Sequence, residues 1–257
     1  MQFQDQLQRS FELTTIPKRI ISLVPSQTEL LVDLGLEDSI VGVTHFCVHP
    51  EGLRDRKTSL GGTKKVNLRK VRDLKPDIIL CNKEENTREM VNALTEIAPV
   101  HCSDVANLDD NAELIRMYGE LFDKSKEANI LIQNIENSLK ELVRIVSNSK
   151  SRRVAYFIWN EPLMVAGQGT FINEMLAVNR MINVFNLDRY PETDLDILRT
   201  MEIDEILLSS EPFPFEDRHK KTFSGIAEKV SLVDGEYFSW YGSRVLEGLK
   251  YFRQFHS

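Results

Sequence analysis

The sequence contains few of the residues that mark several protein classes. Its three cysteines, Cys47, Cys81 and Cys102, form no C-x-x-C pair, so neither a disulfide framework nor a cysteine-based zinc site is indicated. The 12 glycines and 9 prolines are too few for a collagen-like or low-complexity chain. No run approaches the roughly 18 apolar residues of a membrane span, which excludes membrane insertion. The 32 basic and 39 acidic residues give a net charge of −7, which argues against nucleic acid as a partner.

The N-terminal residues are polar, and no common catalytic motif is present. Residues 1–9 include Asp5 and lack the basic and apolar regions of a secretory signal. Together with the unpaired cysteines, they predict a cytoplasmic protein as written, and a periplasmic one if a leader has been removed. The sequence has no G-x-S-x-G, P-loop or G-x-G-x-x-G motif, so we expect a protein that is not an enzyme.

Short β-branched runs alternate with helical periodicity, which is typical of an α/β fold. A first lobe is predicted over residues 19–123 and a second over residues 150–257, while residues 1–18 form an N-terminal extension. Residues 124–149 form a bridging helix, because its apolar stripe continues without glycine or proline. The expected fold is therefore two Rossmann-like lobes with parallel sheets, joined by one long backbone helix. Strands are expected at 19–24, 40–43, 77–81, 99–102, 153–159, 205–209 and 230–233.

Helix starts are predicted from capping residues. Ser26 with Glu29 has the spacing of a capping box, and Asn67 and Thr170 precede apolar periodic segments as N-caps. A helix is also expected from residue 111 to residue 122.

Four stretches carry a family resemblance: Arg19–Leu30, Gly61–Leu68 together with Leu74–Leu80, Asn82–Thr87, and Phe238–Arg244. In this order and spacing, the chain resembles the helix-bridged (class III, TroA-like) ABC-transporter solute-binding proteins, especially the vitamin B12- and iron-chelate-binding branch. The Asn82–Thr87 stretch is typical of bacterial members known as helical-backbone metal receptors. The resemblance implies a non-catalytic protein that binds a small-molecule metal chelate between its lobes: cobalamin or another corrinoid, haem, or a ferric siderophore. No obligatory cofactor is implied.

Two departures from the resemblance concern the ABC permease. Exported B12-binding members carry glutamates that dock on permease arginines, whereas the corresponding positions here are Arg69 and Gly242. A charge reversal at one position and a missing carboxylate at the other argue against permease delivery. The alternative function is a cytoplasmic sensor or partner-binding protein that keeps the fold, and an enzyme is a weaker alternative.

Candidate site residues lie in the loops that follow the predicted strands, where open α/β sheets bind ligands. Aromatic residues there suit a large flat ligand, while basic groups and a helix N-terminus suit its anionic substituents. His45 is a candidate ligand of a chelated metal, but the chain has too few histidines for a bare-metal site. The alternative is that the tryptophans are packing residues and the lysines solvated charges. The candidates are Ser26, His45, Phe46, Lys64, Lys83, Trp159, Phe213, Trp240, Tyr241 and Arg244.

Overall fold

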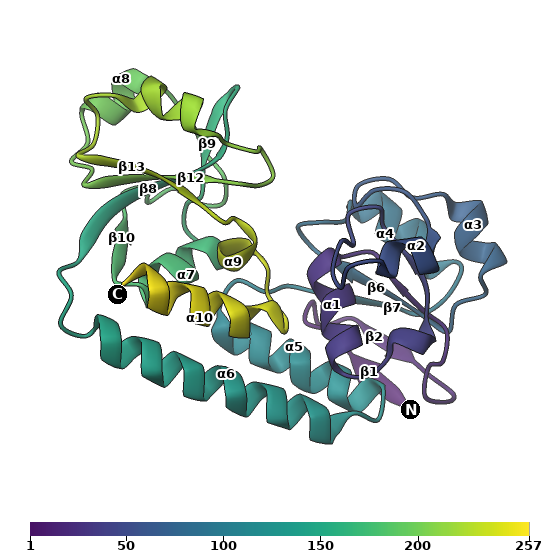
Figure 1. Cartoon of the computed structure of the whole chain (residues 1–257). Coiled ribbons are helices and arrows are strands. Elements are labelled where there is room, and N and C mark those ends of the chain that lie inside the picture. The colour runs from purple at the N-terminus through teal and green to yellow at the C-terminus, as the bar shows by residue number, and fades with distance from the viewer. Residues whose placement is uncertain (257) are drawn as a thin grey trace. The chain divides into compact units, whose positions relative to one another are not determined.

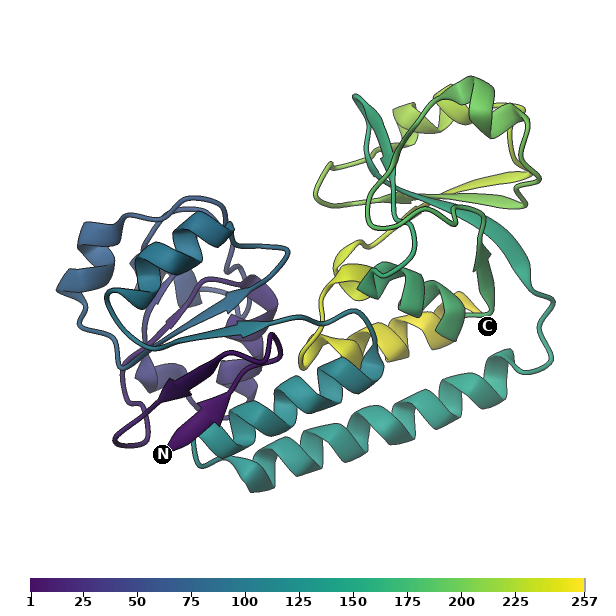
Figure 2. The ribbon, with the colours of Figure 1, turned by 180° about the vertical axis from the view of Figure 1, so that it is seen from behind.

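The computed structural model describes residues 1–256, which divide into two compact units (Figures 1 and 2). No helix of the described residues is both long enough and apolar enough to cross a membrane. The first unit comprises Met1–Val105, Asp109–Gln133 and Tyr241–Arg244, and the second comprises Ala106–Leu108, Asn134–Trp240 and the described residues from Val245 onward.

The first unit is built on a five-stranded sheet whose order is β5-β4-β3-β6-β7 and whose strands are all parallel, as predicted. Every residue of the central strand and of its neighbour that starts at Ile78 is buried, and both strands begin with two isoleucines, a pattern that suits a sheet covered on both faces. The register places Ile20 opposite Ile78 and Cys81 opposite Cys102. The strands are β3 (Ile20–Ser22), β4 (Ile40–Val43), β5 (Thr58–Ser59), β6 (Ile78–Asn82) and β7 (Val100–Ser103).

Helices connect these strands in the manner expected of parallel pairing. The Asn67 side chain accepts a hydrogen bond from the Lys70 amide, which confirms the predicted N-cap. The predicted capping box at Ser26 and Glu29 is wrong. The helix begins at Pro25, a residue that suits the first helical position, so the N-cap is Val24, whose apolar side chain has no atom that could accept a hydrogen bond. The helices are α1 (Pro25–Asp33), η1 (Glu37–Ser39), α2 (Leu53–Arg56), α3 (Leu68–Asp73) and α4 (Arg88–Thr95).

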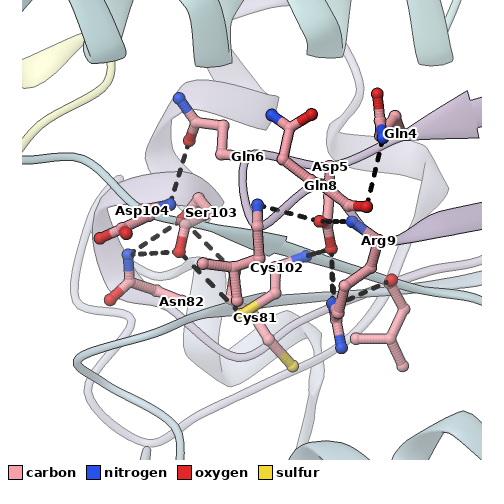
Figure 3. A network of polar contacts seen from close by, with 12 residues as sticks. Gln4, Asp5, Gln6, Gln8, Arg9, Cys81, Asn82, Cys102, Ser103 and Asp104 are labelled. Atoms are coloured by element: carbon pink, nitrogen blue, oxygen red, sulfur yellow. Dashed lines mark hydrogen bonds and ion pairs between the residues drawn. The ribbon is translucent and has the colours of Figure 1, made fainter.

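Residues 1–18, predicted to be an extension, contain an antiparallel hairpin of β1 (Gln2–Gln4) and β2 (Ser10–Glu12). Figure 3 shows how the turn of this hairpin reaches the backbone of β7. The buried Asp5 carboxylate accepts the Cys102 amide at 3.1 Å, and the Arg9 guanidinium donates to the Val100 carbonyl at 3.3 Å. Because β7 is an edge strand, these side chains satisfy backbone groups that would otherwise have no strand partner.

Two helices follow the first sheet. The first, α5 (Leu108–Leu121), starts three residues before the predicted residue 111. The second, α6 (Ser125–Val146), confirms the predicted long helix, and its 22 residues give a length of about 33 Å. Within the second unit, Arg253 contacts both Glu141 and Ser138 of α6.

The second unit contains a six-stranded sheet of order β11-β9-β8-β12-β13, with β10 also paired with β8. It is mixed rather than wholly parallel, because β9 and β11 are antiparallel to their neighbours. The three apolar residues of β9 follow a short turn after Trp159, and such a short run gives no clear strand pattern. The strands are β8 (Arg152–Trp159), β9 (Leu163–Val165), β10 (Met181–Asn183), β11 (Glu192–Thr193), β12 (Glu205–Ser209) and β13 (Lys229–Val233).

Helices cover both faces of this second sheet, with α8 on one face and α7, α9 and α10 on the other (Figure 1). The Thr170 hydroxyl accepts the Asn173 amide, which confirms the predicted N-cap of α7. The helices are α7 (Phe171–Val178), α8 (Leu195–Arg199), η2 (Asp217–Phe223), α9 (Glu236–Ser239) and α10 (Arg244–Phe255).

Candidate ligand-binding site

In the first unit, the loop after β4 presents an exposed aromatic pair. The His45 and Phe46 ring centroids lie 4.1 Å apart, and Phe46 is 50% exposed. The His45 amide donates to the Gly61 carbonyl at 2.9 Å, so this loop is attached to the one that follows β5. A Cβ atom at Gly62 would lie 3.2 Å from the imidazole, so the pair packs closely over the Gly61–Gly62 backbone. Of the predicted site residues in this unit, these two are the exposed rings.

The predicted lysines are exposed, but each contacts another part of the first unit. The Lys64 ammonium donates to the Glu84 carbonyl, and the Lys83 ammonium pairs with the Asp104 carboxylate at 2.5 Å. Both contacts bring positive charge to the loop after β6. The pairing with Asp104 neutralises part of that charge, so Lys83 offers less attraction to a ligand carboxylate than a solvated lysine would.

The Asn82–Thr87 stretch builds the loop after β6 from its own side chains. The Asn82 side-chain Oδ1 accepts the backbone amides of Glu84 and Glu85, which closes the turn. The Asn86 side-chain Oδ1 accepts the Asn82 backbone amide at 2.8 Å, and the Asn86 Nδ2 donates to the Thr63 backbone carbonyl at 2.8 Å. The stretch that carried the family resemblance therefore has a structural role: it joins the Lys64 and Lys83 loops.

Replacing Asn86 by alanine is expected to destabilise this loop locally by about 1–2 kcal/mol, because it leaves two buried backbone groups without their partners. Hydrogen exchange should show faster exchange of the Asn82 amide, which donates to Asn86. Glu89→Ala, at an exposed position of α4, is the matched control and should leave this amide unchanged. Unchanged protection of the Asn82 amide in Asn86→Ala would contradict the role of Asn86 in holding this loop.

The Tyr241–Arg244 segment is integrated into the first unit. Tyr241 is only 7% exposed, and its hydroxyl accepts a hydrogen bond from the Gln27 side chain at 3.0 Å. The Arg244 guanidinium forms an ion pair with Glu29 at 2.7 Å, where the side chains are 10% and 16% exposed. Burial raises the pKa of the Glu29 carboxyl, and the charge of Arg244 opposes that rise. Tyr241 and Arg244, like the buried Ser26, thus support the loops from inside.

Gly242, the position where the resemblance leaves a docking carboxylate missing, has no room for a side chain. Gly242 is buried with a φ of +84°, and its amide donates to the Asn111 side chain at 2.5 Å. A Cβ atom there would lie 3.2 Å from the Ser26 carbonyl, so the position does not present a side chain to a permease. Arg69, at the start of α3, is exposed, as a docking position requires.

In the second unit, the loops after β8 and β12 bring aromatic side chains together. Trp159, the last residue of β8, is 39% exposed, and its indole N–H donates to the Glu161 carbonyl at 3.0 Å. The Phe213 ring meets the Trp159 ring edge-on, with centroids 5.9 Å apart, and also packs on Phe215. Trp159 and Phe213, predicted separately as site residues, therefore belong to one aromatic cluster.

Glu211 is a candidate that the sequence analysis did not single out. Its carboxylate accepts the Trp240 indole N–H at 2.9 Å and the Ser239 hydroxyl at 2.6 Å. Burial raises the pKa of this carboxyl, although both hydrogen bonds favour the ionised form. The sequence feature that could have indicated Glu211 is an acidic residue next to aromatic ones, in the loop Glu211–Phe215 that follows a buried strand.

Other features of the described chain lie apart from these loops. A cavity of about 480 Å³ is lined by Arg9, Phe11 and the segment from Thr95 to Val100, at the amino-terminal side of β7. None of the predicted site residues lines it. Among residues 1–256, no group of three or more histidine, cysteine and acidic side chains is arranged to hold a metal ion.

Comparison with known proteins decides the family. A profile described as periplasmic binding protein matches residues 20–229, which is more than half of the chain. The chain belongs to the periplasmic binding protein family. This family consists of non-catalytic solute-binding proteins, in agreement with the prediction that the chain is not an enzyme.

The relatives within the family include transport proteins. The ABC transporter substrate-binding lipoprotein YvrC of Bacillus subtilis is 31% identical over 171 residues, which cover 63% of this chain and 54% of that protein. The alignment thus spans about half of that relative. The vitamin B12-binding protein of Pectobacterium carotovorum is 22% identical over 236 residues, covering 90% of this chain and 85% of that protein.

A solved structure shows that the fold is shared along most of the chain. The periplasmic heme-binding protein from Pseudomonas aeruginosa superposes with a TM-score of 0.82 at 18% identity, covering 92% of this chain and 91% of that one. Two α/β units with a long helix continuing through both are the class III architecture of this family, as the resemblance implied.

Proposed function

We propose that this chain is a binding protein for a metal chelate of the corrinoid, haem or ferric-siderophore type. The observation that carries the proposal is the exposure of large aromatic rings, Trp159 and Phe46, at the carboxyl ends of strands. Flat apolar ligands gain much of their binding energy from such rings. The B12- and heme-binding names of the relatives support the same ligand class.

His45 is the side chain that would contact the chelated metal or a substituent of the chelate. Its imidazole is exposed beside Phe46, so a flat ligand lying on Phe46 would reach it. Imidazole is a common ligand of iron and cobalt, which makes an axial contact chemically reasonable. The guanidinium of Arg54 donates to the His45 carbonyl at 3.1 Å and helps to hold this loop.

Titration with a panel of chelates tests the proposal. Purified protein would be mixed with cobinamide, cyanocobalamin, haemin and ferric siderophores, while ligand absorbance and tryptophan fluorescence are followed. We expect saturable quenching of tryptophan emission with at least one chelate. No response to any of them at high micromolar concentration would contradict the proposal.

Trp159→Ala is expected to raise the Kd of the bound chelate about tenfold, because it removes a large exposed ring from the contact. Isothermal titration calorimetry measures this without relying on tryptophan emission. Ile197→Ala is the matched control, since Ile197 is 48% exposed on α8, a helix that contains none of the predicted site residues. Equal affinity of Trp159→Ala and the unmodified protein would exclude this ring from the site.

A further inference from the structure

One loop of the second unit contacts both tryptophans of the chain. The strand β12 ends at Ser209, and the loop Glu211–Phe215 follows it. Phe213 packs edge-on against Trp159 with centroids 5.9 Å apart, while the Glu211 carboxylate accepts the Trp240 indole N–H at 2.9 Å. The two rings are therefore held by the same short segment, one through packing and the other through a hydrogen bond.

The Glu211 backbone is fixed by residues at the strand ends. The Ser209 hydroxyl donates to the Glu211 carbonyl at 2.6 Å, and the Tyr156 hydroxyl of β8 donates to the Ser209 oxygen at 3.1 Å. Tyr156 is fully buried in the sheet. The position of Glu211 is thus set by rigid strands rather than by the loop alone, which is the requirement for precise placement of a contact residue.

The segment before α9 is shaped to admit the Glu211 side chain. A Cβ atom at Gly235 would lie 2.3 Å from the Ser209 hydroxyl oxygen and 2.6 Å from Glu211 Cγ, so only glycine fits. At the other end of α9, the Ser239 hydroxyl donates to the same Glu211 oxygen that accepts the indole N–H. Both ends of α9 therefore enclose the carboxylate that orients Trp240.

We propose that Glu211 is a positioning residue, which fixes the ring of Trp240 so that its face is preorganised for stacking on a flat chelate. This inference rests on the proposed function. The hydrogen bond from the Trp240 indole N–H to a fixed oxygen acceptor constrains the rotation of the indole. A ring held in its bound orientation loses less conformational freedom on binding, so the affinity for the ligand is higher.

The test uses a Trp159→Phe background, in which Trp240 is the one remaining tryptophan of the sequence. Glu211→Leu keeps a similar volume but removes the acceptor, whereas Glu211→Gln retains a carbonyl oxygen that can accept the indole N–H. We expect Glu211→Leu to shift the emission and lower the anisotropy of Trp240 without ligand. The parent for comparison is the Trp159→Phe protein. Relative to this parent, Glu211→Leu should also raise the Kd about tenfold for the chelate that the parent binds.

Glu211→Gln should remain within about twofold of the parent Kd, because its side chain still accepts the indole N–H. Glu228→Leu, at an exposed glutamate just before β13, is the control for loss of a negative charge and should match the parent in both measurements. The inference is overturned if Glu211→Leu binds as tightly as the parent, or if Glu211→Gln binds as weakly as Glu211→Leu.

The two proposals fail in different ways. If the parent binds no chelate of the panel, the proposed function is wrong, and the emission and anisotropy of the ligand-free variants decide the role of Glu211. Under those conditions, an unchanged Trp240 signal in Glu211→Leu overturns the positioning role.

Discussion

Replacing Asp5 by alanine is expected to lower the free energy of unfolding of the first unit by about 3 kcal/mol. The Asp5 side chain is fully buried, and it accepts the amides of Leu7, Arg9 and Cys102 at 2.9–3.1 Å. It also accepts two hydrogen bonds from the Arg9 guanidinium, the shorter at 2.7 Å. Alanine would leave the three backbone amides without this acceptor and would remove the carboxylate partner of the partly buried Arg9 guanidinium.

Urea unfolding followed by circular dichroism measures the change in stability, and hydrogen exchange of the Cys102 amide locates it at β7. Glu12→Ala is the control within the same hairpin, because Glu12 is exposed on β2 and should cost less than about 0.5 kcal/mol. Arg9→Ala should cost less than Asp5→Ala, since Asp5 then keeps its three backbone donors. An Asp5→Ala protein within 1 kcal/mol of the unmodified one, on the order of a single hydrogen bond, would refute this account.

The strands were predictable because their signals are local. The runs Ile40–Val43 and Glu205–Ser209 end at turn residues, and the observed strands have the same bounds. The hairpin at residues 2–12 and the short strand β9 were missed for the opposite reason. Their strands are only three residues long, and their stability depends on side chains from distant parts of the chain, such as the contact of Asp5 with β7.

The candidate site was predictable only as a set of loops. Trp159 ends one predicted strand and Phe46 follows another, and the structure places both near strand ends with exposed rings. The partners of the other residues were not accessible from local sequence. Arg244 pairs with Glu29, 215 residues away, and this contact follows from the fold rather than from a spacing rule. The hydrogen bond between Glu211 and Trp240 likewise joins two separate loops.

The second large effect is a loss of folding stability at low pH, and it depends on His101 of β7. Its ring is fully buried between Phe11 of the hairpin and Tyr118 of α5, with centroids 6.2 Å and 5.3 Å away. Among the described residues, neither ring nitrogen has a hydrogen-bond partner. Burial lowers the pKa of His101 from the ordinary value of 6.5 to about 4, with Arg9 acting in the same direction and Asp5 opposing it.

The sign of the pH dependence follows from which state binds the proton. Above the ordinary histidine value of 6.5, the imidazole is neutral in both states and has no effect on the pH slope. As the pH falls from there to about 4, the unfolded chain takes up a proton that the folded chain does not, so stability declines. The shift corresponds to a loss on the order of 3 kcal/mol, which levels off at lower pH.

His101→Phe should remove this loss and flatten the dependence of unfolding free energy on pH across the same interval. At neutral pH the variant should be no less stable, because phenylalanine suits the two aromatic neighbours and carries no unpaired polar atoms. Urea unfolding at a series of pH values measures both effects. Phe11→Leu is the matched control: it changes the packing on His101 by about 1 kcal/mol at every pH and keeps the slope. A His101→Phe protein with the slope of the unmodified chain would show that another group carries the acid sensitivity.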